Sequence, residues 1–590
     1  MLVKLHLIVD SDQLLDAVLQ LEGCKYVALQ LQCEGPDPFL HPSITLALNA
    51  NREDVWLIDF SRLRQLEQVQ SLRRVLEDRT VIKVMHRSKE GIRFLQKLGI
   101  KPNGTWFDPY LAGQILSTPS GPSAFDMQSL VKYYLKTEIP SIPEFGPLYN
   151  ESQWMSFAQV ASTLLPLRSR MVQELLDHNL VEVAKLEFDC IHAVVDMEQT
   201  GMFLNVTAME DLGREIKQQI DALEVKLQPF LGQRKKQMNL LGAEEVSDIN
   251  LDSPDQLRAA LQRKGITVQD TNRHTLHRLS QEHPEVADLL EYRKLSKQLN
   301  TFVDTLPRFV HPHTGRVHSH YEQLGSSSGR FSCSSPNIQQ TPRELAFRAC
   351  WQAPEGRMLV IADYSQIELR VAAEIAQDQR MMKAYQQGED LHRLTASLVS
   401  GVPMALVDKQ QRQAAKAINF GLIFAMGARG LQAYSQDTYG VEMTLSQAEQ
   451  FRRRFFQAYR GIDRWHKRVR EEDAQKRQEG QPSETRTLLG RRYIWSNPAG
   501  VAGLYNMPVQ GSAADITKKA LILIHEENHH PSWHLVGCVH DEILMEVPEQ
   551  DGVEAQYFLK RQMERAGKAI LQSVPVLAES NIGHSWADAK

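Results

Sequence analysis

Apolar and polar positions along the chain follow two different periods. In residues 1 to about 185, strand-like apolar runs at 26–31 and 55–59 alternate with helical periodicity, which predicts an α/β domain. Residues 186 to about 310 are mostly helical and charged, with a polar, basic break near 232–237. From about 311 onward strands and long helices mix again, and 452–477 is a highly charged helical stretch. The pattern predicts a multidomain chain of α/β and α+β class.

Composition leaves this picture unchanged. A chain of 590 residues suggests about four domains at roughly 150 residues each. The 42% of hydrophobic and 24% of charged residues are typical of a globular protein with a sizeable core. The net charge of -5 is mild evidence against a nucleic-acid-binding protein. A large enzyme can nevertheless hold a basic groove within an acidic average, so the distribution of charge matters more.

Cysteines and termini indicate the compartment. No C-x-x-C pair or zinc-type Cys/His spacing occurs, and scattered thiols favour a reducing compartment such as the cytoplasm. The six cysteines are Cys24, Cys33, Cys190, Cys333, Cys350 and Cys538. The first ten residues end in an acid and predict a strand rather than a signal peptide. The sequence contains no run of about 18 apolar residues, so no membrane span is predicted.

An aspartate ends one predicted strand. The apolar run 358–362 leads to Asp363, and the spacing of Ile367, Val371 and Ile375 then becomes helical. Asp363 therefore lies at the C-terminal end of a strand, where its carboxylate can be exposed. The alternative is a simple helix cap.

A second strand end carries acids far downstream. The strand pattern 534–540 leads to Asp541 and Glu542, and 543–547 continues as a strand, which predicts a hairpin with an acidic two-residue connection. A plain turn is the alternative. If the two strand ends meet, Asp363 and Asp541 could bridge two Mg²⁺ ions, with the Tyr364 carbonyl as a further ligand.

The stretch 412–429 predicts a helix with an unusual face. Arg412, Lys416, Phe420 and Phe424 are four residues apart and stay near one side. Cations followed by aromatics suit a triphosphate at one end and a sugar and base at the other. The alternative is an amphipathic helix with core aromatics and solvated cations. Gly421 and Gly427 lower helix stability, roughly 1 kcal/mol each, so close approach to a ligand or another element is expected.

These segments resemble motifs A, B and C of the A-family DNA polymerases, the DNA polymerase I type: DYSQIELR (363–370), RQAAKAINFGLIFAMG (412–427) and VHDE (539–542). The stretches 328–342, 390–393, 506–515 and 583–586 resemble the family as well. The resemblance covers about residues 186–590, and weaker patterns reach back to the start.

The resemblance implies an RNase H-like exonuclease-type domain followed by a right-hand polymerase. Its divisions are 1–185 exonuclease-like, 186–310 thumb, 311–390 with 500–590 palm, and 391–499 fingers. In the thumb, Lys294 and Lys297 have two alternative roles that stay open: contact with phosphates, or a solvated position on the surface. Since the chain begins with the exonuclease-like domain, it resembles the Klenow-type portion, with no 5′-nuclease domain. The implied function is template-dependent synthesis from dNTPs on a primer–template DNA, by a monomer.

Site roles follow from the motif match. Asp363, Tyr364 and Asp541 are implied ligands of two Mg²⁺ ions, for which Mn²⁺ substitutes, and Glu542 supports them. Lys416 is the implied acid for the leaving pyrophosphate. The implied dNTP-binding residues are Arg412, Lys416, Phe420, His392, Glu368, Phe424 and Gln366. Phe420 in place of tyrosine implies discrimination against dideoxynucleotides.

Glu368 resembles the steric gate that excludes a 2′-hydroxyl. Its family partner is often a tyrosine where this chain has Phe424, which cannot donate a hydrogen bond, so weaker ribonucleotide rejection is expected. Arg330 resembles a minor-groove reader of the primer end. The implied DNA-binding residues are Arg330, Asn337, Gln339, Asn506, Gln510 and His540. Ala502 or Gly503 stands where the family has a basic residue, which removes one template contact.

The exonuclease-like domain departs from its family at the positions that need carboxylates. Gln30 and Gln32 occupy the first motif, Gly91 the second and Val160 the third, with Ser156 at the third motif's tyrosine. Amides and apolar groups cannot replace four anionic ligands, so we expect no proofreading. Two alternative hypotheses are a catalytically inactive nucleic-acid-binding scaffold and a single-chain RNA polymerase. Glu368 argues against the RNA polymerase. The biological pathway, processivity, RNA-template use, lesion bypass and any processivity partner stay open.

Overall fold

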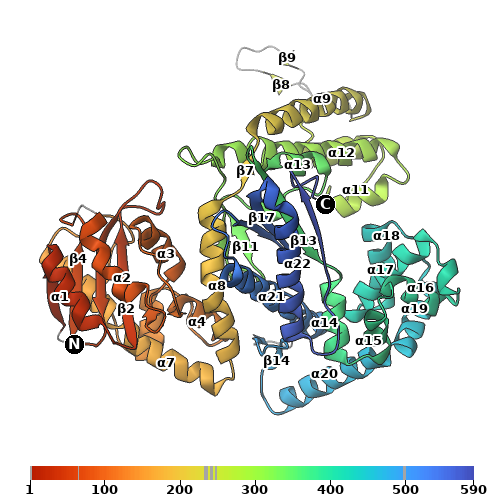
Figure 1. Ribbon diagram of the computed structural model, residues 1–590. Coiled ribbons are helices and arrows are strands. Elements are labelled where there is room, and N and C mark those ends of the chain that lie inside the picture. The colour runs from red at the N-terminus through yellow and green to blue at the C-terminus, as the bar shows by residue number, and fades with distance from the viewer. Residues whose placement is uncertain are drawn as a thin grey trace. The chain divides into compact units, whose positions relative to one another are not determined.

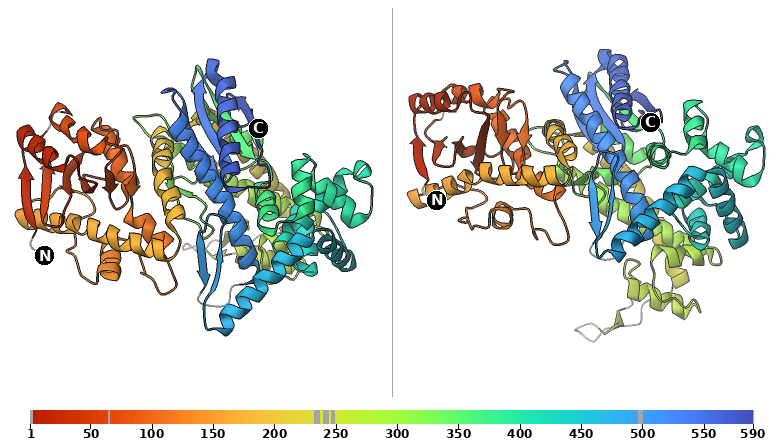
Figure 2. Two further views of the ribbon diagram at one scale, coloured as in Figure 1. Left: turned by 60° about the horizontal axis from the view of Figure 1, so that its bottom comes forward. Right: turned by 90° about the horizontal axis from the view of Figure 1, so that it is seen from below.

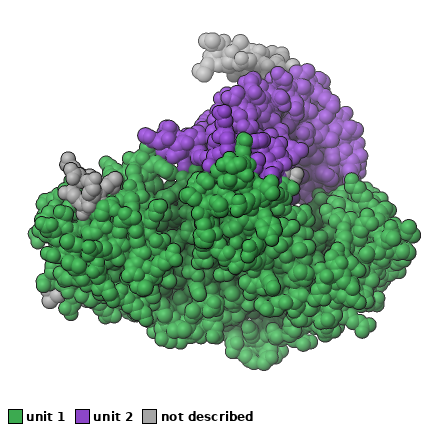
Figure 3. All heavy atoms as spheres, in the orientation of Figure 1, with its two compact units in different colours: residues 1–200, 321–333, 360–581 green, residues 201–320, 334–359, 582–590 purple. Residues whose placement is uncertain are grey.

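The computed structural model describes residues 3–63, 66–231, 237–238, 244–245, 249–495 and 500–589. It divides into two compact units (Figure 3). The first unit contains residues 1–200, 321–333 and 360–581, and the second contains 201–320, 334–359 and 582–590. The chain thus crosses between the units several times.

A six-stranded sheet organises the N-terminal region of the first unit, in the order β1-β4-β3-β2-β5-β6. Its strands are β1 (Lys4–Ile8), β2 (Tyr26–Cys33), β3 (Ser43–Asn49), β4 (Asp54–Asp59), β5 (Ile82–Val84) and β6 (Trp106–Phe107). β3 runs antiparallel to β2 and β4, whereas β1 with β4, and β2 with β5, pair in parallel. The predicted strands at the N-terminus, 26–31 and 55–59 are confirmed.

Helices cover this sheet on both faces (Figure 1). They are α1 (Ser11–Leu21), η1 (Leu66–Leu72), α2 (Arg73–Leu76), α3 (Ser88–Lys97), α4 (Pro109–Ile115), α5 (Met127–Leu135), α6 (Glu151–Ser162) and α7 (Leu164–Asp177). Leu46 and Leu48 of β3 pack in the core that contains α1, whereas Ala47 packs with Phe157 of α6. Because successive side chains of a strand point to opposite faces, both faces of this sheet are buried.

Helix α8 (Val181–Thr200) continues through residue 185 without interruption. It packs against α3, α4 and α7 of the N-terminal region. It also packs against α21 (Val501–Glu527) and β16 (His534–Val539). The expected boundary at 185/186 therefore falls inside a helix that joins the two halves of the first unit.

The predicted carboxylate strands lie in a four-stranded sheet, in the order β16-β17-β13-β18. The other strands are β17 (Glu542–Pro548), β13 (Arg357–Tyr364) and β18 (Ala578–Gly583). The associated helices are α14 (Ile367–Ala376), η6 (Glu549–Asp551) and α22 (Gly552–Ile570). α21 packs along α22 and α14 (Figure 1).

A helical cluster follows α14. It contains α15 (Gln379–Gln386), α16 (Leu391–Ser400), η5 (Met404–Leu406), α17 (Lys409–Ile423), α18 (Ala428–Tyr439), α19 (Leu445–Ala458) and α20 (Arg460–Gln478). α16 to α19 stay together in both views of Figure 2. The charged stretch 452–477, expected as one helical segment, is two helices that meet at Tyr459. The hairpin of β14 (Ser483–Arg486) and β15 (Arg492–Trp495) comes next.

The second unit is mainly helical, as expected for 186–310. Its elements are β7 (Phe203–Leu204), α9 (Val206–Leu231), β8 (Gln237–Met238), β9 (Glu244–Glu245), α10 (Pro254–Arg263), α11 (Arg273–Leu279), α12 (Pro284–Gln298), η2 (Leu299–Val303), η3 (Leu306–Phe309), η4 (Ile338–Gln340), α13 (Leu345–Ala349) and β12 (Trp351–Gln352). Most of the basic break at 232–237 lies outside the described residues. Lys294 pairs with Glu344 at 3.3 Å in this unit.

The two ends of the segment 321–333 lie in β10 (His320–Glu322) and β11 (Ser332–Ser334), which form a two-stranded sheet. All six cysteines are free thiols. Among the described helices, none is both long enough and apolar enough to cross a membrane.

Candidate active site

Asp363 and Asp541 lie at the ends of neighbouring strands, as the sequence predicts. Asp363 is the penultimate residue of β13, and Asp541 comes directly before β17, which borders β13 in the sheet. Burial, the largest effect, raises the pKa of Asp541 above its ordinary value, and the neighbouring Glu542 raises it further. The charges of Arg330 and His540 oppose this rise. The site thus holds a desolvated carboxylate that a cation would stabilise.

The hairpin connection is one residue earlier than expected. β16 pairs with β17 antiparallel, and Val539 lies opposite Glu542. The two connecting residues are therefore His540 and Asp541, with His540 in the left-handed region at φ 61°. Glu542 is a buried strand residue rather than a loop residue. This register leaves Asp541 at the turn as the more exposed member of the acidic pair.

The donor set at this sheet edge fits a hard divalent cation. It offers carboxylate oxygens from Asp363 and Asp541 and the main-chain carbonyl of Tyr364, which are the ligand types that Mg²⁺ prefers. The Tyr364 hydroxyl is directed elsewhere, since it donates to the Met563 carbonyl oxygen at 2.8 Å. Among the described residues, no group of three or more His, Cys, Asp or Glu side chains could hold a metal ion.

Helix α17 presents the predicted cationic and aromatic face. It begins with a capping box at Asp408 and Gln411. Arg412, Lys416 and Phe420 are half-buried, whereas Ala415, Ile418 and Leu422 of the same helix are buried. The alternative of fully core aromatics therefore does not apply to Phe420.

Helix α16 completes this face. Asp390 caps α16 by accepting hydrogen bonds from the main-chain N–H groups of His392 and Arg393, and its other oxygen accepts a 2.7 Å bond from Arg412 Nε. The Asn419 amide donates to His392 Nδ1 at 2.9 Å. Burial lowers the pKa of His392 to about 4, and the charges of Arg412 and Lys416 contribute to this lowering. His392 is thus a neutral imidazole beside two cations.

Helix α17 ends one residue before Phe424, earlier than the periodicity predicts. Phe424 is the C-cap residue, with φ −94° and ψ 23°, and the half-buried Ala425 that follows has a positive φ. The expected close approach is confirmed at Gly421, where a Cβ would lie 3.1 Å from Leu431 of α18. No element in the described part of the chain approaches Gly427, which caps α18 and has no atom within 4 Å of an added Cβ.

Glu368 has a partner that the sequence did not predict. The Arg330 guanidinium donates to the Glu368 carboxylate in the first turn of α14. Gln366, before this helix, has φ 57° and accepts a 3.3 Å hydrogen bond from the Tyr385 hydroxyl. The hydrogen bond between Arg330 and Glu368 thus joins two residues that were expected to act separately, Arg330 on the primer and Glu368 on the nucleotide.

The other expected DNA-binding residues fall in different places. Asn506 and Gln510 are half-buried and one turn apart on α21, and His540 lies in the hairpin turn of the same unit. Asn337 and Gln339 belong to the second unit, where the Asn337 side chain accepts from the Gln339 N–H at 3.1 Å.

At three of the four degenerate exonuclease positions, other groups form hydrogen bonds or pack closely. Gln30 and Gln32 lie on β2, and the buried Gln32 amide donates to the carbonyl oxygens of Pro143 and Gly146 at 3.2 and 3.1 Å. Gly91 lies on α3, where a Cβ would collide with the buried Met85 side chain. Val160 is buried in α6. None of the four positions carries an anionic oxygen ligand.

A buried ionic cluster behind Arg330 was missed by the sequence analysis. It contains Glu187 of α8, Arg491 before β15, and Asp515 and Lys518 of α21. In the sequence, the one sign of this cluster is that Asp515 is the last residue of the stretch 506–515, which resembles the family. Charged residues far apart in sequence give no indication that they meet.

Two strand-end carboxylates in one sheet, together with a helix that carries two cations and a half-buried aromatic, are the features expected of a nucleotidyl-transfer enzyme of the polymerase class. The sequence model described as DNA polymerase family A matches residues 207–588, and one described as 3′-5′ exonuclease matches 5–142. The chain therefore belongs to the A family of DNA polymerases, and it is a DNA-directed DNA polymerase. DNA polymerases of this family use divalent metal ions, generally Mg²⁺.

Relatives support this assignment along the chain. DNA polymerase I of Aquifex aeolicus is 31% identical over 591 residues, which cover 97% of each chain. The thermostable DNA polymerase I of Thermus filiformis is 35% identical over 417 residues, covering 67% of this chain and 47% of that protein. The POL domain of Pol1 from M. smegmatis, solved in complex with DNA primer-template and dNTP, has a TM-score of 0.83 at 25% identity. That match covers 99% of this chain and 100% of the solved chain.

Proposed function

We propose that the chain adds dNTPs to a primer 3′-hydroxyl at a site in which Asp363 and Asp541 hold two Mg²⁺ ions, for which Mn²⁺ substitutes. The observation that carries this proposal is the position of the two aspartates at the ends of the adjacent strands β13 and β17. When bound, the ions would stabilise charge on the attacking and leaving oxygens. The Tyr364 carbonyl is a further ligand, and Glu542 supports the turn.

The triphosphate binds along the exposed face of α17. Asp390 fixes the Arg412 guanidinium, and among the described residues no carboxylate pairs with Lys416, so its ammonium is available to a phosphate. Lys416 then donates the proton that neutralises the leaving pyrophosphate. His392, held neutral by burial, donates from the ring nitrogen that Asn419 does not contact. Phe420 packs against the sugar.

Arg330 contacts the primer end in the minor groove, and Glu368 excludes a 2′-hydroxyl. Gln366 and Phe424 border the nucleotide, while Asn506, Gln510, His540, Asn337 and Gln339 contact the DNA. The palm comprises 311–390 and 500–590, the fingers 391–499, the thumb 186–310, and the exonuclease-like domain residues 1–185.

The exonuclease-like domain has lost proofreading. Amide, glycine and valine positions cannot supply the four carboxylates that a two-metal nuclease site requires. Gln32 is engaged by main-chain carbonyls, and the space at Gly91 is taken by Met85. This domain contributes packing to α8 instead of chemistry.

Primer extension tests both statements. A labelled primer–template with a matched or mismatched end is incubated with Mg²⁺ and dNTPs, using the wild type and Asp541→Asn. Asp12→Asn, on an exposed first turn of α1, is the matched charge control. We expect extension by the wild type and the control, loss in Asp541→Asn, and no shortening of the mismatched primer. Extension by Asp541→Asn at the wild-type rate would overturn the metal assignment, and Mg²⁺-dependent shortening would overturn the loss of proofreading.

A further inference from the structure

The loop that carries Arg330 is held by a buried cluster of charged side chains. Lys518 Nζ donates to the main-chain oxygens of Gln323 and Gly329 at 2.7 and 2.8 Å, and to Glu187 Oε1 at 2.6 Å. Its three ammonium protons are thereby all used. One fully buried cation thus fastens both ends of the turn 323–329, and Arg330 is the next residue.

Arg491 packs closely against the same turn. Its guanidinium bonds Asp515 at 2.6 and 2.9 Å and Glu187 at 2.5 Å. Its Cδ and Nε would lie 3.0 Å from a Cβ on Gly329, whose φ is +81°. Only a glycine both adopts this conformation readily and leaves room for the guanidinium.

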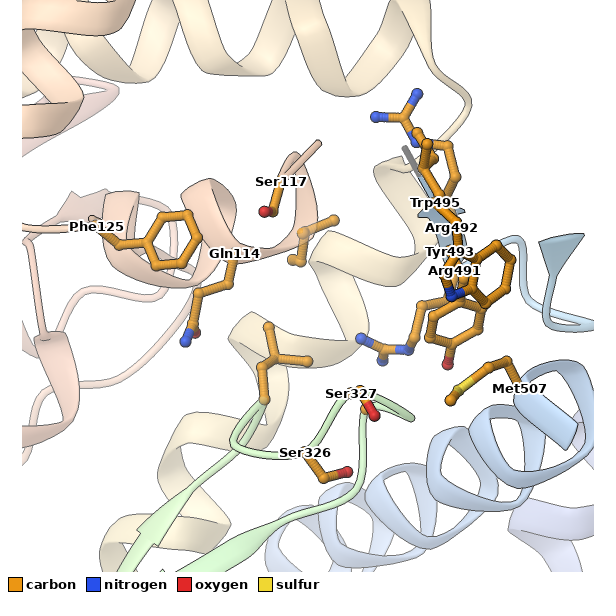
Figure 4. Close-up of a pocket in the computed structure, with 14 residues that line it drawn as sticks. Gln114, Ser117, Phe125, Ser326, Ser327, Arg491, Arg492, Tyr493, Trp495 and Met507 are labelled. Carbon is orange, nitrogen blue, oxygen red and sulfur yellow. The ribbon is translucent and has the colours of Figure 1, made fainter. Parts of the chain in front are cut away.

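Tyr493 adds a third contact. Its hydroxyl donates to the Ser328 main-chain oxygen at 2.7 Å. Figure 4 shows Arg491 and Tyr493 beside the segment of the turn that carries Ser326 and Ser327, on one wall of a cavity of about 330 Å³. The turn therefore borders open space and is nevertheless tied to the protein by hydrogen bonds from Tyr493 and Lys518.

The cluster is electrically balanced. Two carboxylates, Glu187 and Asp515, face two cations, Arg491 and Lys518, and all four are buried. Burial raises the pKa of Glu187, but the charges of Lys518 and Arg491 outweigh it and hold the pKa below its ordinary value. A fully hydrogen-bonded buried network of this kind rigidifies what it contacts.

We propose that this cluster positions Arg330 for its contact with the primer end, so that Lys518 is a positioning residue of the polymerase reaction acting through the Gly329–Arg330 backbone. The proposal rests on the proposed role of Arg330. Lys518 itself lies beneath the turn and does not touch substrate. Loosening the turn spreads the Arg330 guanidinium over many positions, which weakens its test of primer-end geometry.

The test measures the ratio of kcat/KM for extension from matched and mismatched primer ends, in protein corrected for its active fraction. The variants are Lys518→Met, Arg330→Ala and the double variant. Lys519→Met is the matched control, because among the described residues this neighbouring lysine donates no hydrogen bond to the turn. Tyr493→Phe is a milder variant that removes one hydrogen bond and preserves the ionic cluster.

We expect Arg330→Ala and Lys518→Met each to lower the ratio roughly tenfold, and Lys519→Met to leave it unchanged. Tyr493→Phe lowers it in the same direction by a smaller factor. Because Lys518 acts through Arg330, the double variant has the ratio of Arg330→Ala alone.

Two results would overturn the inference: an unchanged ratio in active Lys518→Met and Tyr493→Phe, or effects of Lys518→Met and Arg330→Ala that multiply. An unchanged ratio in Arg330→Ala is a different failure, since it would refute the proposed role of Arg330 itself. If Lys518→Met does not fold, the result for Tyr493→Phe decides.

Discussion

The Arg330 guanidinium donates a hydrogen bond to the Glu368 carboxylate, which joins the segment 321–333 to the first turn of α14. Both side chains are partly buried, with 34% and 19% of their surfaces exposed. A charged donor fixes a carboxylate more strongly than a neutral hydroxyl does. The carboxylate proposed to exclude ribonucleotides is therefore oriented by arginine, although Phe424 cannot donate to it.

Replacement of Phe424 by tyrosine should improve the rejection of ribonucleotides. A tyrosine hydroxyl can give Glu368 a second donor, which restricts the carboxylate further. We expect a several-fold rise in the ratio of kcat/KM for dNTP over the matching rNTP, with little change for dNTP alone, in line with about 1 kcal/mol for one hydrogen bond. Single-nucleotide insertion with both substrates measures this ratio.

Phe424→Leu is the control for the gate, since it changes packing without adding a donor. It should leave the ratio near that of the wild type. A ratio for Phe424→Tyr that equals that of Phe424→Leu would show that the added hydroxyl does not reach the gate.

Restoring acids in the exonuclease-like domain should not restore proofreading. In Gln30→Asp/Gln32→Glu, the new carboxylate at 32 faces the carbonyl oxygens of Pro143 and Gly146, which now accept hydrogen bonds from the Gln32 amide. A buried carboxylate that has no hydrogen-bond donor destabilises the folded protein. We expect no Mg²⁺-dependent shortening of a mismatched primer and a lower midpoint in urea unfolding.

The matched control for this double variant is Gln30→Ala/Gln32→Ala, which removes the amides without adding charge. It should be less destabilised than the acidic variant. Shortening of the primer by Gln30→Asp/Gln32→Glu would mean that the remaining ligands are still in place, and the assignment of Gly91 and Val160 would then be wrong.

The elements nearest the chemistry were predictable because they depend on local patterns. The apolar run before Asp363 and the helical spacing after it correspond to β13 and α14. The hairpin at Asp541 was also predicted, but its register was not. His540 adopts φ 61°, which moves the turn one residue earlier and makes Glu542 a strand residue. Turn conformation depends on backbone angles that the apolar pattern does not encode.

Long-range pairs could not be predicted. Lys518 and Glu187 are 331 positions apart, and Arg330 and Glu368 are 38 apart. Each of these residues, taken alone, is as compatible with a solvated surface charge as with a buried partner. The end of α17 before Phe424 was also missed, since a four-residue spacing continues into the cap without a change in residue type.

Acidification should destabilise the fold through buried histidines. His466 of α20 is bonded to the Ile423 carbonyl oxygen at 2.9 Å, and burial lowers its pKa to about 4. Because the unfolded state has the ordinary pKa near 6.5, it binds more protons than the folded state between pH 6.5 and 4. The free energy of unfolding therefore falls as the pH falls through this window, by at most about 1.4 kcal/mol per pH unit for each such histidine.

The measurement is urea unfolding at pH 7.5 and pH 5 for the wild type and His466→Gln, whose amide does not titrate. We expect the variant to be less stable at pH 7.5 but to lose less on acidification. Equal losses in the two proteins would assign the pH dependence to other groups, including His86, His192 and His392, whose pKa values are also lowered to about 4 by burial.

Lys89 lies in the exonuclease-like domain, and Lys89→Met should destabilise the first unit. Lys89 Nζ bonds Glu198 Oε1 and the Tyr321 main-chain oxygen, both at 2.8 Å, and Glu198 in turn accepts from the Tyr321 N–H at 2.7 Å. Breaking a buried ion pair costs up to about 3–5 kcal/mol, and because Arg93 still faces Glu198 at 3.3 Å we expect a loss below this range. Lys97→Met, in the same helix and exposed, is the control and should cost little. Glu198→Gln in the Lys89→Met background should recover some of the loss in urea unfolding, because it removes a buried charge that has lost its shorter ion pair. A double variant less stable than Lys89→Met would show instead that Glu198 is held mainly by Arg93, at 3.3 Å, and that Lys89 contributes through Tyr321 alone.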